Sequence, residues 1–130
     1  MLKVYNLADK ICAHRDNGGH ATEVPAGARL LFCNGQVGAR PDASVPEDTG
    51  DQIEVIFERI GAILEAADMS FQDIVKLTVY VTNQAIFEDF YRLRGNYMGH
   101  HHPPVVLLVV GPFPRPGVQV EIEAVAAKVD

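Results

Sequence analysis

The chain has 130 residues, of which 48% are hydrophobic and 22% charged, a composition typical of a globular domain rather than a disordered chain. Its 17 acidic and 11 basic residues give a formal net charge of -6 without a Lys/Arg stripe, which argues against nucleic acid as a partner. Cys12 and Cys33 lack a CxxC spacing, and no apolar run has the length of a membrane helix. We expect one cytoplasmic domain over residues 1–130, without a membrane partner.

The N-terminal third predicts short strands separated by turns. Residues 2–5 alternate weakly as a first strand, and residues 16–19 and 23–27 have the Gly, Asn and Pro content of turns. The apolar run from Leu30 to Cys33 predicts a strand that ends at Asn34-Gly35, two residues that tolerate positive φ. The end of this strand is therefore a candidate place for exposed polar chemistry.

Two amphipathic helices are predicted further along the chain. From residue 51, apolar side chains recur at steps of three and four, which predicts a helix of about four turns that ends near residues 66–68. Asp48 or Thr49 is its expected cap. The residues 82–84 are expected to cap a second helix, which has apolar positions from Ile86 to Tyr97 and ends at Gly99.

Three longer strands complete the prediction. Residues 74–81 are rich in β-branched side chains, and residues 105–110 form a continuous apolar run that predicts a strand buried on both faces. Residues 118–124 alternate strictly, with Glu121 on the polar face. This order of elements predicts an α+β fold with two helices on one face of a mixed sheet. A single copy would expose the apolar run at 105–110, so we expect a homo-oligomer.

Three segments resemble the signatures of the RidA/YjgF superfamily, and they occur in the order that this family shows. Residues 31–37 resemble its strand followed by S-G-Q, residues 67–81 its D-[VI]-V-K-x-T segment, and residues 117–126 its V-x-[VI]-E-I-E-A-[VI]-A ending. The resemblance spans residues 30–126. It implies a chorismate-mutase-like subunit in a homotrimer around a central barrel, with small-molecule clefts between subunits and no cofactor.

The resemblance also implies roles for particular residues. Glu121 matches the glutamate that orients water in the family, and Asn34-Gly35 matches the segment that lines the cleft. Tyr91 matches an asparagine of the second helix, and His20 falls where the family often has an aromatic residue over the ligand. The family's carboxylate-binding arginine lies two residues after a proline, and this position is Val105. Because valine cannot bind a carboxylate, we expect a divergent branch without the standard 2-imino acid deaminase activity.

Each candidate also has a structural interpretation that the residues alone leave open. Glu121 could lie on a solvated edge or in a salt bridge, Asn34-Gly35 could be only a turn, and Tyr91 could belong to the core. The sequence leaves open equally whether His20 faces the ligand or lies away from it. The adjacent histidines at 100–102 lack the spacing and partners of a metal site, so no metal is expected.

Three functions are consistent with these observations. The first is a hydrolase acting on an imine, enamine or related C–N or C–O bond, in which Glu121 activates water and residues 34–35 orient the substrate. The second is a non-catalytic ligand-binding or regulatory trimer, which the missing arginine favours. The third is an endoribonuclease, against which the acidic net charge argues.

Overall fold

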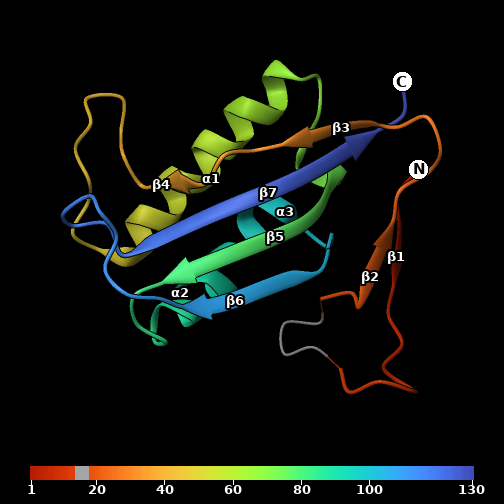
Figure 1. Ribbon diagram of the computed structural model, residues 1–130, viewed down its shortest axis with the longest axis horizontal. Coiled ribbons are helices and arrows are strands. Elements are labelled where there is room, and N and C mark those ends of the chain that lie inside the picture. The colour runs from red at the N-terminus through yellow and green to blue at the C-terminus, as the bar shows by residue number, and fades with distance from the viewer. Residues whose placement is uncertain (14–17) are drawn as a thin grey trace.

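A computed structural model describes residues 1–13 and 18–130 of the chain. The elements, in chain order, are β1 (Lys3–Tyr5), β2 (Ala21–Glu23), β3 (Arg29–Phe32), β4 (Gln36–Val37), α1 (Thr49–Ala66), the 3-10 turn η1 (Phe71–Asp73), β5 (Ile74–Val81), α2 (Ile86–Leu93), α3 (Gly95–Met98), β6 (Val105–Val109) and β7 (Val120–Lys128). The strands β3, β7, β5 and β6 are neighbours in that order. The short strand β4 also pairs with β7, along the same edge as β3. The helices lie together behind this sheet, while β1 and β2 form a separate arm (Figure 1).

The sheet is mixed, because β5 and β6 run parallel whereas β3, β4 and β5 all pair antiparallel with β7. The observed fold therefore confirms the prediction of two helices on one face of a mixed sheet. The boundaries of β5 agree with the sequence prediction, and α1 begins after Asp48, whose carboxylate accepts a hydrogen bond from the Asp51 backbone N–H at 2.9 Å. This contact satisfies one of the amides that every helix start leaves unpaired.

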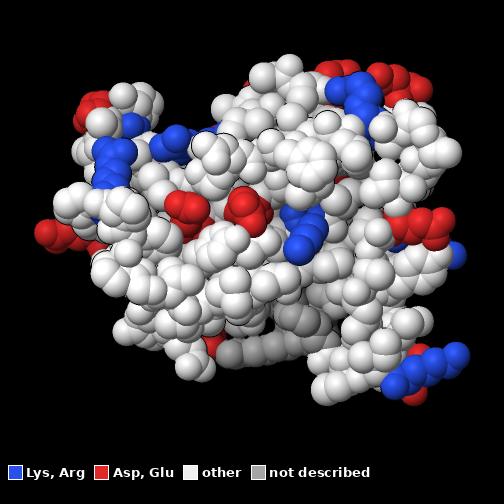
Figure 2. Space-filling model, viewed as in Figure 1, with Lys and Arg blue, Asp and Glu red and all other residues white. Residues whose placement is uncertain are grey.

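The hydrophobic core lies between the sheet and the helices. Alternate side chains of β5 and β7 point toward α1 and α2 and are almost fully buried, among them Leu77, Val79, Val120 and Ile122. The intervening side chains point to the opposite face, which none of the described helices covers (Figure 1). We call this second surface the open face. Figure 2 views it directly and shows acidic and basic side chains near its middle.

The structure corrects several predictions made from local pattern. The strand predicted over residues 105–110 is not buried on both faces of this chain, because Val106 and Leu108 point to the open face and β6 is also the outer strand of the sheet. Val106, Leu108 and Val109 are all exposed there. The strand 118–124 is displaced, since β7 starts at Val120 and continues to Lys128. The short strands β2 and β4 were not predicted.

The second helix also differs from the prediction, because it is divided into α2 and α3 at Arg94. No side chain caps the start of α2; instead, the Asn83 carboxamide accepts a hydrogen bond from the Ala85 backbone N–H. Gly99 ends α3 with a φ of 57°, as predicted. The predicted turn at 23–27 is present, whereas residues 16–17 of the other predicted turn lie outside the described residues.

Candidate functional site

Glu121 lies on the open face of β7, near the end of the sheet where β4 joins it. Its position in the register is between Val37 of β4 and Tyr80 of β5. The side chain is half-buried, yet its carboxylate forms no ion pair or hydrogen bond with any residue that the structure describes. Both oxygens of Glu121 are therefore available to water or a ligand.

Gly35 lies beside the carboxylate of Glu121. A Cβ atom at this position would lie 2.8 Å from the carboxyl carbon of Glu121, so the Glu121 side chain would have to move to accommodate it. The strand ends before Asn34-Gly35 as predicted, although neither residue adopts the positive φ that both tolerate. Exposed Asn34 is adjacent, and its carboxamide oxygen accepts a hydrogen bond from the Gly35 backbone N–H at 3.1 Å. The structure thus brings Asn34, Gly35 and Glu121 together.

A buried hydrogen-bond network holds this bend between β3 and β4. The Gln36 side chain donates to the Asn34 carbonyl at 2.8 Å and accepts from Arg59 Nε at 3.0 Å. Arg59, on α1, also donates to the carbonyls of Val37 and Ala39. Sequence analysis missed both residues. The only signal was the Gln that follows Asn34-Gly35, because nothing in the local sequence pairs it with an arginine on α1.

Tyr80 and Glu123 form a pair next to Glu121. The Tyr80 hydroxyl donates a hydrogen bond to Glu123 Oε1 at 2.8 Å across neighbouring strands. This hydrogen bond is the main reason that the pKa of Tyr80 is raised, with smaller contributions from desolvation and from the negative charges of Glu123 and Glu121. Glu123 is therefore held by a neighbour, whereas Glu121 is not. Tyr80 was not identified from the sequence.

Val105 does not lie near Glu121. Its side chain is buried in the core, in register with Leu77, on the helix-covered face of the sheet. The next residue, Val106, is in register with Thr78 on the open face and is 38% exposed. Two prolines precede β6, and counting two residues from Pro104 rather than Pro103 leads to Val106. The position on the open face is therefore Val106, and it is also uncharged.

Tyr91 and His20 are also remote from Glu121 within one chain. Tyr91 is on α2, behind the sheet, where it packs against the core with its ring 5.9 Å from that of Phe90. His20 precedes β2 in the separate arm, and its ring contacts the Leu7 N–H and the Cys12 carbonyl, each at 3.0 Å. These contacts give His20 a structural role in the arm (Figure 1).

Two of the three adjacent histidines and the buried Cys33 each have separate local surroundings. His101 Nε2 lies 2.7 Å from the Ile74 carbonyl, and His102 Nδ1 lies 2.8 Å from an Arg94 nitrogen. Burial raises the pKa of the Cys33 thiol, which keeps it protonated and unreactive. Among the residues described, no group of three or more His, Cys, Asp or Glu side chains could hold a metal.

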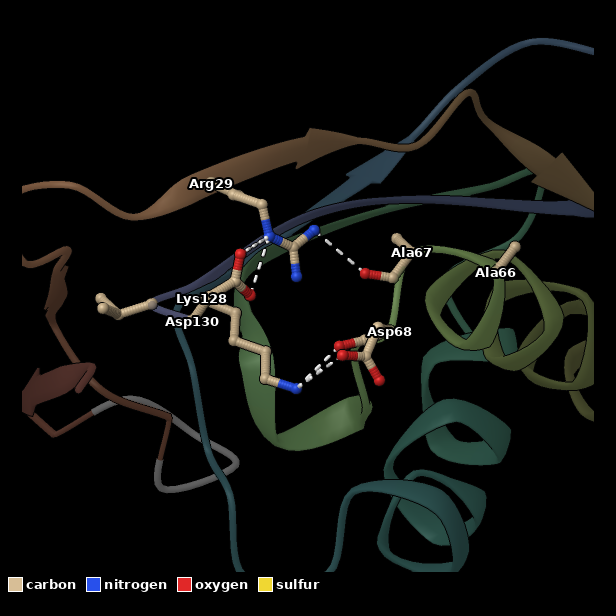
Figure 3. Close-up of a pocket in the computed structure, with 7 residues that line it drawn as sticks. Arg29, Ala66, Ala67, Asp68, Lys128 and Asp130 are labelled. Atoms are coloured by element: carbon tan, nitrogen blue, oxygen red, sulfur yellow. Dashed lines mark hydrogen bonds and ion pairs between the residues drawn. The ribbon is translucent and has the colours of Figure 1, made fainter.

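A large surface hollow at the opposite end of β7 is a poor candidate for the site (Figure 3). Its two cations are already engaged: Arg29 pairs with Asp130 at 2.8 Å, and the Lys128 ammonium contacts the Asp68 carbonyl at 2.7 Å. Arg29 also donates to the Ala67 carbonyl at 3.0 Å. These internal pairs leave the hollow without an unpaired charge to recognise a ligand.

Comparison with known proteins agrees with this architecture. The family model described as Endoribonuclease L-PSP matches residues 20–128. A RutC family protein of Pyrococcus horikoshii is 35% identical over 113 residues, covering 85% of this chain and 88% of that protein. TdcF of Escherichia coli, whose name provisionally assigns it as a reactive intermediate deaminase, is 30% identical over 103 residues, covering 76% and 79%.

Solved structures show the same fold. A Rid-family protein of unknown function from Yersinia pestis, YyfB, superposes with a TM-score of 0.86 at 23% identity and covers 98% of both chains. RidA from an Antarctic Psychrobacter superposes with a TM-score of 0.72 at 27% identity, covering 92% of this chain and 100% of that one. The fold and the matched sequence define a Rid-type protein. The chain belongs to the RidA/YjgF superfamily, and none of its described helices is long and apolar enough to span a membrane.

Proposed function

We propose that the chain is a RidA-like hydrolase that cleaves an imine, enamine or related C–N or C–O bond, with Glu121 activating the water. The observation that carries this proposal is the free carboxylate of Glu121 beside the Gly35 backbone. A carboxylate without an internal partner can accept a proton from water, and the exposed Asn34 can hydrogen-bond the substrate. The name given to TdcF supports a deaminase among its relatives.

We propose further that the cleft forms between subunits of a homotrimer. Asn34, Gly35 and Glu121 leave one side of the site open, because no helix in the described part of the chain covers the open face. His20 directly precedes β2 and contacts Leu7 and Cys12, whereas Tyr91 lies on α2 against Phe90, so we propose that either reaches a Glu121 carboxylate from another copy of the chain. This arrangement would give each site residues from two subunits.

The substrate of this cleft is proposed to lack a carboxylate beside the reacting carbon. Two residues of β6 share the open face with Glu121, namely Val106 in register with Thr78 and Leu108 in register with Tyr80, and neither offers a charge or a hydrogen bond. A carboxylate brought near the negative Glu121 without a cation would be repelled and poorly solvated. We therefore expect neutral imines to be better substrates than 2-imino acids.

A comparison of matched imines tests both proposals. Ammonia release should be faster for an imine of a simple ketone than for the corresponding 2-imino acid, and Glu121→Gln should abolish it without changing the melting temperature. Glu65→Gln, an exposed substitution on α1, is the matched control and should have wild-type activity. Unchanged turnover in Glu121→Gln would remove this residue from the mechanism. Failure of every imine, enamine and ester tested would instead favour the non-catalytic ligand-binding function.

A further inference from the structure

A second, smaller hollow lies on the open face, farther along β7 from Glu121. Its volume is about 240 Å³. Glu123 and Val125 of β7 lie between walls formed by Phe32 and Cys33 on one side and by Lys76 and Thr78 of β5 on the other. Glu121 does not line it, so this hollow is distinct from the site described above. Pockets that bind drug-sized ligands have volumes of about 300–1,000 Å³, so this hollow suits a smaller molecule.

Two opposite charges line this hollow without neutralising each other. In the register, Thr78 is opposite Glu123 and Lys76 is opposite Val125, so Lys76 and Glu123 are diagonal neighbours. Such neighbours are typically about 7–8 Å apart, and no ion pair joins these two among the described residues. The Lys76 ammonium also makes no hydrogen bond within that part of the chain.

The remaining polar groups are arranged around these charges. The Tyr80 hydroxyl donates a hydrogen bond to Glu123 Oε1 and so orients the carboxylate. The second carboxylate oxygen, Oε2, has no partner among the described residues. Thr78 is only 8% exposed, and its hydroxyl forms no hydrogen bond with any residue described. Since this hydroxyl is not among the buried polar atoms that lack a partner, it is accessible from the hollow, where water or a ligand could hydrogen-bond it. The other walls, Phe32 and Val125, are apolar.

We propose that this hollow binds a small α-amino acid in its zwitterionic form. Lys76 would bind the carboxylate, Glu123 would bind the ammonium, and the Thr78 hydroxyl would hydrogen-bond between them. A simple anion would lie next to Glu123 and a simple cation next to Lys76, each with a repulsive contact that a zwitterion avoids. Phe32 and Val125 would contact a short apolar side chain, and the small volume excludes a large one.

Calorimetric titration of the assembled protein with L-alanine tests this site. Propionate lacks the ammonium of L-alanine and ethylamine lacks its carboxylate, so each should bind at least roughly tenfold more weakly. Equal binding of the three probes, or no detectable binding of L-alanine, would overturn the proposal. Melting temperature and light scattering verify that each variant keeps the fold and assembly of the wild type.

Single substitutions locate the bound amino acid. Lys76→Met and Glu123→Gln should each weaken L-alanine roughly tenfold or more, and Gln at 123 retains an acceptor for the Tyr80 hydroxyl. Lys10→Met, at an exposed lysine near the arm, should leave binding unchanged. Glu121→Gln should also retain L-alanine binding. Loss of binding in Glu121→Gln combined with wild-type binding in Lys76→Met would place the amino acid in the cleft and refute this site.

Discussion

The two valines that begin β6 face opposite sides of the sheet, so an arginine should have opposite effects at these positions. Val105→Arg would bury an unpaired guanidinium beside Leu77, which should lower the free energy of unfolding by more than about 3 kcal/mol. Val106→Arg places the same group on the open face and should change stability by less than about 1 kcal/mol. Urea denaturation of both variants measures this difference.

Substitutions of Val106 also test the substrate preference. Val106→Arg should increase turnover of 2-imino acids relative to neutral imines, because a charge-assisted contact contributes about 1.5–3 kcal/mol, or roughly 10- to 150-fold. Val106→Lys is a useful second variant, since its point charge lacks the bidentate geometry and should give a smaller gain. Rapid hydrolysis of 2-imino acids by the wild type would contradict the argument from Val106.

Tyr80 provides a residue-scale prediction about alkaline pH. Its pKa is raised in the folded chain, so the hydrogen bond to Glu123 stabilises the fold below the unfolded tyrosine pKa of about 10. That contribution is lost as the pH rises through the higher folded value. Tyrosinate absorbance, taken as the difference between wild type and Tyr80→Phe, should show this high pKa. Glu123→Gln should move it to lower pH, and an unchanged titration would show that Glu123 is not its cause.

Some of these residues were predictable and others were not, for physical reasons. Glu121 and Asn34-Gly35 are identified by a local signature, and strand alternation alone assigns Glu121 to the polar face. The position of the family's arginine was assigned to Val105 by counting two residues from Pro103, whereas counting from Pro104 leads to Val106. Only the strand register shows that Val106 is the residue on the open face. Tyr80 and Arg59 were missed because their partners are distant in sequence. Sequence periodicity assigns a face to a residue but does not identify its neighbour.

At the scale of elements, the local pattern predicted the central pieces of the fold better than its edges. β5 and α1 were predictable because each is long and has consistent periodicity. β4 has only two residues and exists because β7 pairs with it, so no local signal identifies it. The apolar run of β6 correctly indicated a strand, but continuous hydrophobicity could not show that several of its side chains are exposed in this chain.

Gln52 is the element-scale contact that joins α1 to the loops around the Glu121 end of the sheet. Its fully buried carboxamide donates to the carbonyls of Pro46 and Gly117 at 2.8 and 2.9 Å and accepts from the Gln119 backbone N–H at 3.0 Å. Gln52→Leu would leave these three groups without their partner and should destabilise the fold by about 2–4 kcal/mol. Thermal unfolding measures the loss.

A glutamine at an exposed position supplies the control for this contact. Gln84→Leu, between β5 and α2, should change stability by less than about 0.5 kcal/mol. Since the loops near Gln52 also flank the end of β7 that carries Glu121, Gln52→Leu should reduce activity even at temperatures where the chain remains folded. Equal stability of the two leucine variants would show that the Gln52 network is not important for the fold.

At the scale of the whole molecule, the open face is too apolar for an isolated chain. Leu30 of β3 is 57% exposed and Leu108 of β6 is 44% exposed, on the two outer strands of this face. Exposed apolar groups gathered on one sheet face mark a subunit contact, and burying each large side chain contributes about 1.5–3 kcal/mol. Together with the proposed cleft, this surface predicts a homotrimer.

Light scattering during size-exclusion chromatography measures the predicted assembly. The wild type should have about three times the 14.2 kDa mass of one chain at micromolar concentration. Leu108→Lys should dissociate the assembly, because it would bury a charge in the contact without a partner. Val129→Lys, which replaces an exposed apolar residue near the C-terminus, should leave the mass unchanged. A stable wild-type monomer would contradict both the trimer and the intersubunit cleft, whereas the amino-acid hollow, whose named residues all come from one chain, would remain testable.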